Sequence, residues 1–389
     1  MLPRLLTIPL VTHPCYHWRL LGLLLGMLLP LFFCTTHPVS AATVTVTNTN
    51  DSGPDSLRQL IVDAAPGDTI DFDISLSGQT IVLSQTLTID KDLTIDGSAL
   101  STPITLSGNQ RVLVLMVKAG VTASLRRFTV ANGDRGSLPI GPFPSLSAGL
   151  YVGAGLQNDG TVTLDRLTFQ HNRTVGSKGE GGLGGAIGNN GVLTVTNSLF
   201  WQNSGGSGSG ILNEGRLSIA NSTFAGNVAT NGWGGGRGGA IDNTGTLTVT
   251  NSTFSRNVAF GGYGAPGAGA IDNKGMAWIL NSTFSDNRST AYTANEGAGS
   301  GIANRGTLHL YNTIIANGID SADCSGALAT NINNLIEDGS CGAAFSGDPL
   351  LGPLVDYGGA TFTQALLPGS PAIDAGDNTT CLATDQRGV

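Results

Sequence analysis

The stretch 240-AIDNTGTLTVTNSTFSRN-257 decides the fold of this chain, because the chain repeats it 30 residues later as 270-AIDNKGMAWILNSTFSDN-287. Within it, Thr246–Thr250 alternates polar and apolar residues, which is typical of a β-strand with one buried face. Asparagines and a glycine bound the short apolar segments, and these residue types favour turns. The unit therefore reads as short strands joined by tight turns.

The same unit recurs through the middle of the chain at intervals of 24 to 31 residues. Self-similarity at a fixed period is the signature of a stacked repeat architecture. One motif is Phe-x-x-Asn, continued once by Ile, and it begins at Phe169, Phe200, Phe224, Phe254, Phe284 and Ile314. The second motif is small-apolar-x-Asn, and it ends at Asn158, Asn189, Asn213, Asn243, Asn273 and Asn304.

Strands that recur without a helical segment between them must stack in parallel in a coil of short strands and turns. The sequence therefore predicts an all-β fold, a right-handed parallel β-helix solenoid. We expect Ile241, Leu247, Val249 and Phe254 to point inward, the asparagines to stack as ladders, and glycines to provide corners with positive φ.

The composition agrees with an ordered, turn-rich chain. The 389 residues include 57 glycines, 12% charged residues and 40% hydrophobic residues. That apolar share permits a sizeable core and excludes a disordered chain. The net charge of -8 makes nucleic acid an unfavourable partner, since its backbone is bound by basic surfaces.

The first 41 residues predict a signal peptide. Arg4 and Arg19 precede an apolar run over residues 20–33, and small residues follow at 39–42. The alternative, a membrane anchor, would need ~20 apolar residues to span a bilayer. We therefore expect a secreted or cell-surface protein with no transmembrane span in the mature chain, and a monomer.

The mature chain divides into three expected regions: residues 43–97 form an N-terminal cap and the first coils, 98–317 the β-helix repeats, and 318–389 an irregular C-terminal segment. Residues 55–65 have an amphipathic helical pattern, with Ser56 and Gln59 spaced as a capping box. This helix is expected to cover the N-terminal end of the solenoid.

Three cysteines remain after the signal peptide: Cys324, Cys341 and Cys381. In an exported, oxidising setting we expect a disulfide between Cys324 and Cys341, which close a short loop. Cys381 is then either a free thiol or paired outside this chain.

Three sequence features resemble known families. The Gly-Gly-Ala-Ile and Phe-x-x-Asn motifs are similar to the repeats of chlamydial polymorphic outer membrane proteins. Residues 45–61, TVTNTNDSGPDSLRQLI, resemble the N-terminal segment of exported bacterial β-helix proteins of the Cys-Ser-Leu-Arg-Glu-Ala type, with Asp55 in place of the cysteine. Residues 348–388, with Leu367-Pro368-Gly369-Ser370-Pro371-Ala372-Ile373-Asp374, resemble the choice-of-anchor Q domain.

This resemblance implies an exported bacterial surface protein with a pectate-lyase-like fold and no assigned catalytic residue. Family members usually continue past Gln386-Arg387-Gly388, so the resemblance also implies a truncated C-terminal segment. The polygalacturonase pattern of paired aspartates, Gly-His-Gly and Arg-Ile-Lys is absent from the sequence.

Asp242 and Asp272 are the candidate catalytic residues. They hold the same position in adjacent repeats, so their side chains are expected near the ~4.8 Å strand spacing. Stacked carboxylates repel unless a cation or shared proton intervenes, which makes them candidates for calcium binding or acid–base chemistry. The alternative is two solvated side chains that splay apart.

Trp278, His309 and Tyr311 are the candidate ligand-binding residues. Outward positions of the repeat strands carry small polar residues in four repeats and become aromatic at these three positions. Exposed flat aromatic rings suit sugar rings. The alternative is that the C-terminal segment or the loop with Phe260 and Tyr263 covers them.

The sequence thus favours a secreted or cell-surface β-helix scaffold that is adhesive or carbohydrate-binding and non-catalytic, with a polysaccharide or cell-surface glycan as its partner. No cofactor and no metal site are assigned. The alternative function is a calcium-assisted polysaccharide lyase or a glycoside hydrolase that uses Asp242 and Asp272.

Overall fold

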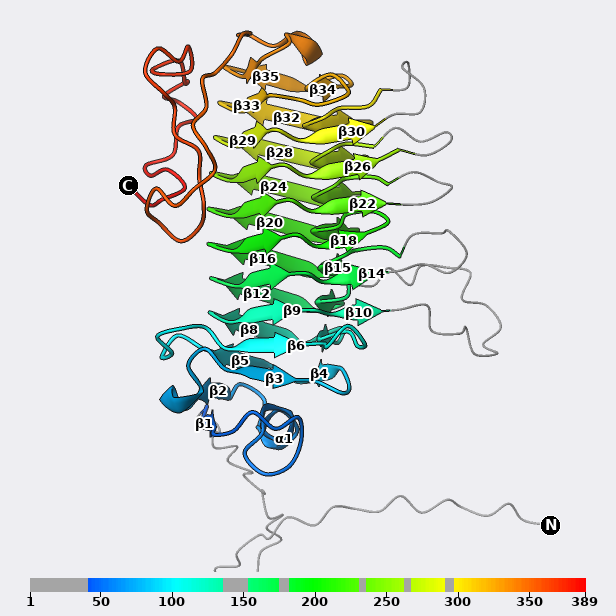
Figure 1. Ribbon diagram of the computed structural model, residues 1–389, viewed down its shortest axis with the longest axis vertical. Coiled ribbons are helices and arrows are strands. Elements are labelled where there is room, and N and C mark those ends of the chain that lie inside the picture. Colours follow the sequence, from blue (N-terminus) through cyan, green and yellow to red (C-terminus); the bar gives the residue numbers. More distant parts are fainter. Residues whose placement is uncertain (1–40, 136–152, 175–181, 231–235, 262–266, 291–296) are drawn as a thin grey trace, which may run out of the picture. The chain divides into compact units, whose positions relative to one another are not determined.

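The computed structural model describes residues 41–135, 153–174, 182–230, 236–261, 267–290 and 297–389. The chain is a right-handed parallel β-helix whose strands form four parallel sheets, here called sheets A to D (Figure 1). Except for Ala41, the expected signal peptide lies outside the described residues.

Each middle turn of the solenoid, called a rung, passes through sheet A, sheet B, sheet D and sheet C in that order, while the first and last described rungs have no strand in sheet D. Sheet A contains β1 (Thr43–Val46), β2 (Thr69–Phe72), β5 (Leu93–Asp96), β8 (Thr122–Arg126), β12 (Thr161–Asp165), β16 (Val192–Thr196), β20 (Arg216–Ala220), β24 (Thr246–Thr250), β28 (Met276–Leu280), β32 (Thr307–Tyr311) and β35 (Thr330–Ile332). Sheet B contains β3 (Thr80–Val82), β6 (Thr105–Ser107), β9 (Thr129–Ala131), β13 (Thr168–Gln170), β17 (Leu199–Trp201), β21 (Thr223–Ala225), β25 (Thr253–Ser255), β29 (Thr283–Ser285), β33 (Ile314–Ala316) and β36 (Leu335–Ile336).

The other two sheets complete the rungs. Sheet C contains β4 (Leu87–Ile89), β7 (Leu115–Val117), β11 (Leu156–Asn158), β15 (Ile187–Asn189), β19 (Ile211–Asn213), β23 (Ile241–Asn243), β27 (Ile271–Asn273), β31 (Ile302–Asn304) and β34 (Cys324–Ser325). Sheet D contains β10 (Asp134–Arg135), β14 (Arg173–Thr174), β18 (Ser204–Gly205), β22 (Val228–Thr230), β26 (Val258–Phe260) and β30 (Arg288–Thr290).

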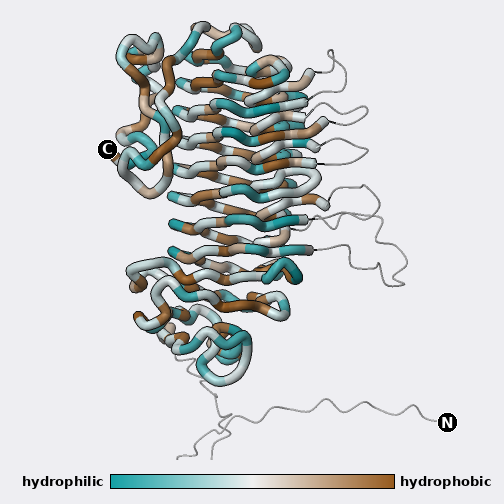
Figure 2. Tube along the Cα trace, viewed as in Figure 1, coloured by the Kyte–Doolittle hydropathy of each residue, from teal (hydrophilic) through white to brown (hydrophobic). Residues whose placement is uncertain are grey.

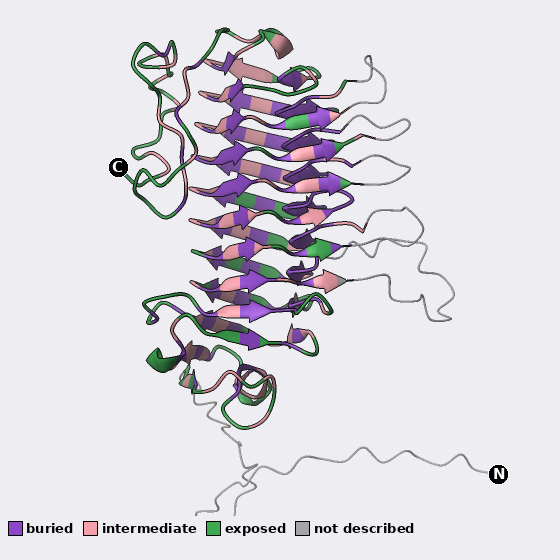
Figure 3. Cartoon of the chain, in the orientation of Figure 1, coloured by how far each residue is buried: buried purple, intermediate pink, exposed green. Residues whose placement is uncertain are grey.

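The core is a continuous apolar column inside the solenoid. Ile241, Leu247, Val249 and Phe254 are fully buried, as the alternation predicts. Hydrophobic residues recur at the same places in successive rungs, and buried residues follow the strands (Figures 2 and 3). The phenylalanines of the repeat stack one above another, with ring centroids 4.3 to 5.1 Å apart and nearly parallel planes: Phe169, Phe200, Phe224, Phe254 and Phe284.

The predicted asparagine ladders are present at two corners. After sheet C, the amide Nδ2 of each asparagine donates to Oδ1 of the next at 2.7 Å, from Asn158 to Asn304. After sheet B, Asn257 Nδ2 donates to Asn287 Oδ1 (3.0 Å) and to the Phe224 carbonyl (2.9 Å). The ladders satisfy buried polar groups that the turns would otherwise leave unpaired.

Glycines with the expected positive φ occur before sheet C, at Gly184, Gly208 and Gly238, but the glycines at the corner after sheet C do not have it. Instead, a Cβ on Gly245 would lie 2.1 Å from the Gly215 carbonyl oxygen, and one on Gly275 would lie 2.0 Å from the Gly245 oxygen. Close stacking of the rungs therefore requires glycine here.

A column of non-glycine residues with positive φ lies at the corner between sheets A and B, and most of these residues are asparagines. This corner column contains Arg127, Arg166, Asn197, Asn221, Asn251, Asn281, Asn312 and Asn333, with φ between 44° and 54°. Asparagine tolerates this left-handed conformation better than most other non-glycine residues. Asparagine is thus favoured in this corner column by its backbone conformation.

The N-terminal helix has the predicted cap. Helix α1 (Leu57–Asp63) buries Leu57 and Ile61, and the Ser56 hydroxyl accepts a hydrogen bond from the Gln59 amide. The Gln59 side chain bonds to Asp63 and does not complete the expected capping box. A short 3-10 helix, η1 (Ile74–Leu76), follows β2. No helix in the described residues is long and apolar enough to cross a membrane.

The solenoid continues one rung beyond Asn317, where the sequence repeat fades. The added rung contains β34, β35 and β36, and the 3-10 helix η3 (Ser340–Gly342) packs against β34. The expected disulfide joins Cys324 to Cys341 in this rung, while Cys381 is free and exposed. The repeat motif fades because the register partner of Phe284 is Ile315 in β33, followed by Ile336 in this rung.

Residues 348–389, here called the tail, run back along the solenoid over sheet B (Figure 1). Two antiparallel bridges fold the tail on itself, Leu351 with Leu366 and Val355 with Thr363. Its segments extend along the side of the stack and do not cover its end. The tail is therefore a lateral cover for one sheet.

The ladder predicts a large cost for removing one asparagine. Asn257→Ala should lower the free energy of unfolding by at least about 3 kcal/mol, because the backbone N–H of Asn227 and the Phe224 carbonyl lose their partner inside the core. Asn190→Ala is the matched control, since Asn190 is exposed and its side-chain amide donates to Asp159 outside the core. Thermal unfolding followed by circular dichroism tests this, and equal midpoints for the two variants would contradict it.

The last rung predicts a pH dependence of stability. Burial of Asp323, reinforced by the charge of Asp338, raises the pKa of Asp323 to about 6. The folded state then holds this proton more tightly than the unfolded state, so the stabilising contribution of Asp323 is fully present below about pH 4 and is lost as the pH rises through 6. In Asp323→Asn this loss should disappear from urea denaturation measured between pH 4 and 7, and a profile identical to the wild type would refute the assignment.

Candidate functional site

The aromatic candidates lie on the outer surface of sheet A, here called the sheet A face. Its central column contains Thr163, Thr194, Ser218, Thr248, Trp278, His309 and Thr330, one from each successive strand from β12 to β35. The first four side chains are small, and the column then changes to two aromatic rings. Trp278 and His309 are both partly exposed.

Trp278 and His309 stack on each other, with ring centroids 5.3 Å apart and planes 6° from parallel. A hydrogen bond of 2.7 Å between His309 Nδ1 and Thr330 Oγ1 fixes the imidazole from the other side. One face of the indole therefore contacts His309, and its other face turns toward Thr248 in the neighbouring strand. Tyr311 lies in the adjacent column, in register with Leu280.

In the described residues, the tail forms no hydrogen bond with the side chains of Trp278, His309 or Tyr311, which are all partly exposed. The hydrogen bonds of the tail in the described residues go to sheet B and to the corner column: Thr223 to the Phe362 carbonyl, and Asn251, Asn281 and Asn312 to the carbonyls of Thr384, Thr380 and Asp377. Trp201, on sheet B, meets Phe362 of the tail edge-on at 6.2 Å. Of the other expected cover, Phe260 lies at the end of β26 in sheet D and is exposed, and Tyr263 lies outside the described residues.

The carboxylate candidates lie on sheet C. Asp242 in β23 and Asp272 in β27 are direct neighbours in register. Both side chains point away from the apolar core but are buried, at 4% and 0% exposure, so they are not the solvated, splayed pair considered as the alternative. Lys274 Nζ lies 2.8 Å from Asp242 Oδ1 and 3.2 Å from Asp272 Oδ2. Arg305 forms a second ion pair with Asp272.

The lysine and arginine change what the two acids can do. Burial, together with the charge of Asp242, raises the pKa of Asp272, while Lys274 and Arg305 oppose this shift. Two carboxylates and two basic groups make a neutral cluster, so the repulsion expected between stacked carboxylates is already compensated within the chain. In the described residues, no group of three or more potential metal ligands is found.

The structure does not combine the two candidate sets into one site. The acids lie on sheet C and the aromatic rings on sheet A, separated by the corner that contains Lys274. Sequence reasoning missed Lys274 and Arg305 as partners of the acids. The available signal was their shared position: each follows the ladder asparagine of its rung, Asn273 or Asn304, and so reaches back toward the preceding strand.

The buried cluster predicts that Lys274 stabilises the fold. Lys274→Met should lower the free energy of unfolding by about 3 kcal/mol, because it leaves a buried carboxylate uncompensated. The double variant Lys274→Met/Asp242→Asn should recover much of this loss. Urea denaturation measures both, and a double variant less stable than Lys274→Met would contradict the coupling.

Comparison with known proteins supports the fold alone. No protein family model matches the chain, and no curated protein matches it in sequence. Among solved structures, one described as "Crystal structure of pectate lyase Pel9A" is similar at 14% sequence identity and a TM-score of 0.51. The similarity covers 90% of this chain and 95% of that one. The chain thus has a pectate-lyase-like parallel β-helix.

Proposed function

We propose that this chain is an exported, surface-displayed β-helix that binds carbohydrate on the sheet A face without cleaving it. The observation that carries this proposal is the stacked Trp278–His309 pair at the end of a column of small polar side chains. Since the tail bonds to sheet B, this pair remains partly exposed. Large aromatic surfaces on a protein exterior mark interaction sites.

The geometry suits a sugar ring. The indole face that turns toward Thr248 has only small neighbours along its column, namely Thr248, Ser218, Thr194 and Thr163. A pyranose lying over Thr248 would place its apolar C–H face against the indole and its hydroxyls near the threonine and serine hydroxyls. Such a site combines one aromatic anchor with polar groups that orient the ligand.

Catalysis is not part of the proposal. The similar solved structure is described as a pectate lyase, but one fold hosts many unrelated functions. Lys274 and Arg305 already neutralise Asp242 and Asp272, so this pair offers no additional reason to propose a calcium-assisted lyase or a glycoside hydrolase.

The proposal predicts a specific effect of the indole. Trp278→Ala should weaken binding to a neutral polysaccharide by about tenfold or more, as expected for a tryptophan anchor. Trp201→Ala is the matched control, because Trp201 lies under the tail on sheet B and should leave the affinity unchanged. Isothermal titration with a panel of dextran, xylan, β-glucan and chitin oligosaccharides measures this.

The same incubations should release no product. Reducing ends or unsaturated products that appear with calcium and disappear in Asp242→Ala would replace the proposal with catalysis. An affinity that falls equally in Trp278→Ala and Trp201→Ala, or no binding to any member of the panel, would refute the site on the sheet A face.

A further inference from the structure

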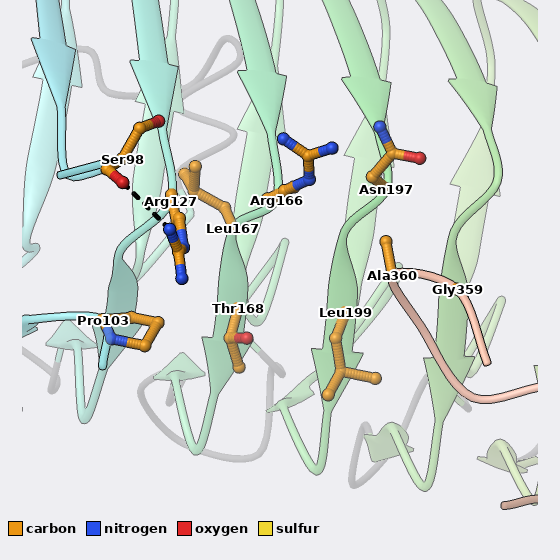
Figure 4. Close-up of a pocket in the computed structure, with 10 residues that line it drawn as sticks. All are labelled: Ser98, Pro103, Arg127, Arg166, Leu167, Thr168, Asn197, Leu199, Gly359 and Ala360. Carbon is orange, nitrogen blue, oxygen red and sulfur yellow. Dashed lines mark hydrogen bonds between the residues drawn. The ribbon is translucent and has the colours of Figure 1, made fainter. Parts of the chain in front are cut away.

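A groove of about 580 Å³ lies at the corner between sheets A and B, four strands along sheet A from Trp278. Its two ends are formed by residues 98–103 and by Gly359 and Ala360 of the tail (Figure 4). The volume lies in the range of ligand pockets, ~300–1,000 Å³. The tail therefore stops short of these rungs and leaves their corner open.

Two arginines occupy this open part of the corner column. In the next six rungs the column contains only asparagine, and four of these asparagines form hydrogen bonds with the tail. In two of the rungs that line the groove, the column contains Arg127 and Arg166, at φ 52° and 54°, and Asn197 of the next rung also lines it. Arginine is less suited than asparagine to this left-handed backbone. Arginine thus replaces asparagine in a part of the corner column to which the tail does not bond.

The two arginines differ in how they are held. Arg127 Nη1 donates to the Ser98 carbonyl at 2.9 Å and its Nη2 to the Ser101 carbonyl at 3.4 Å, so it supports one wall of the groove. The Arg166 side chain is 60% exposed, and its nearest charged partner in the described residues is Asp165 Oδ2 at 3.8 Å. Figure 4 shows Arg166 without a hydrogen bond to any other residue drawn.

Asp165 does not fully neutralise the charge of Arg166. Its Oδ1 atom accepts hydrogen bonds from Thr196 Oγ1 at 3.1 Å and from Asn197 Nδ2 at 2.7 Å. These bonds fix the carboxylate beside Asn197. The guanidinium of Arg166 therefore keeps its donors available for a ligand, and Arg127 adds a second positive charge in a chain whose net charge is -8.

We propose that this groove binds an anionic polysaccharide through Arg127 and Arg166. A guanidinium pairs with a carboxylate or a sulfate through two parallel hydrogen bonds. The rest of the lining is small or aliphatic, as at Pro103, Leu167 and Thr168, and lacks the aromatic rings on which nucleic acid bases stack. This site is separate from the sheet A face and does not depend on the function proposed there.

The test uses the mature chain and four polymers: polygalacturonate, dextran sulfate, poly-glutamate and unmodified dextran. Arg166→Asn gives the rung the residue that the column prefers, so the fold should keep its thermal midpoint. Its affinity for the anionic polysaccharide should fall about tenfold, and Arg166→Lys should retain more affinity than Arg166→Asn.

Arg256→Asn is the matched control, because Arg256 is exposed, has φ 57°, and lies at the corner after sheet B. Its affinity should equal that of the wild type. Binding to polygalacturonate or to dextran sulfate that is lost in Arg166→Asn alone supports the proposal, and the two polymers separate carboxylate from sulfate recognition.

Equal losses in Arg166→Asn and Arg256→Asn would show attraction to charge in general and overturn the proposal. Binding to poly-glutamate without binding to either anionic polysaccharide would overturn it as well, as would no binding to any charged polymer. Trp278→Ala should leave these affinities unchanged, so failure of this site and failure of the sheet A face are distinguishable.

Discussion

The structure depends on buried amide–amide hydrogen bonds between equivalent asparagines in successive rungs. A coil of strands two to five residues long has a corner after every strand, and each corner turns backbone polar groups away from the sheets. Asn203, Asn227 and Asn257 satisfy them by donating to a neighbouring rung and to the carbonyl of a core phenylalanine. Because each asparagine needs the next, the ladder also fixes the register of the strands.

Because the strand register is fixed, equivalent surface residues of successive rungs form columns. Substitutions in one column can create a binding site without altering the other columns. Three columns depart from their local pattern. The sheet A face becomes aromatic at Trp278 and His309, the outer column of sheet C becomes acidic at Asp242 and Asp272, and the corner column becomes basic at Arg127 and Arg166. Lys274 and Arg305 compensate the acidic pair within the chain. The aromatic pair faces solvent, and the two arginines line a groove.

The features that recur in every repeat could be predicted from the sequence. The features that depend on contacts between residues far apart in sequence could not. The parallel β-helix, the inward positions of Leu247 and Val249, and the asparagine ladders follow from alternation and spacing. The path of the tail could not be predicted, because its partners, such as Thr223 for the Phe362 carbonyl, are far away in sequence. The same reason hid the contribution of the tail residues Gly359 and Ala360 to the arginine groove. The last rung escaped detection because the aromatic position of sheet B is already isoleucine at Ile315 and again at Ile336.

The corner glycines place a limit on how such a chain can vary. Each of them lies against the carbonyl of the glycine in the rung before it, as Gly275 does against Gly245 and Gly245 against Gly215. A methyl group at one position would push that rung away from its neighbour, and the tilt would pass to every rung stacked beyond it. The glycine column therefore keeps successive rungs aligned. A side chain added at one position would displace every rung stacked beyond it.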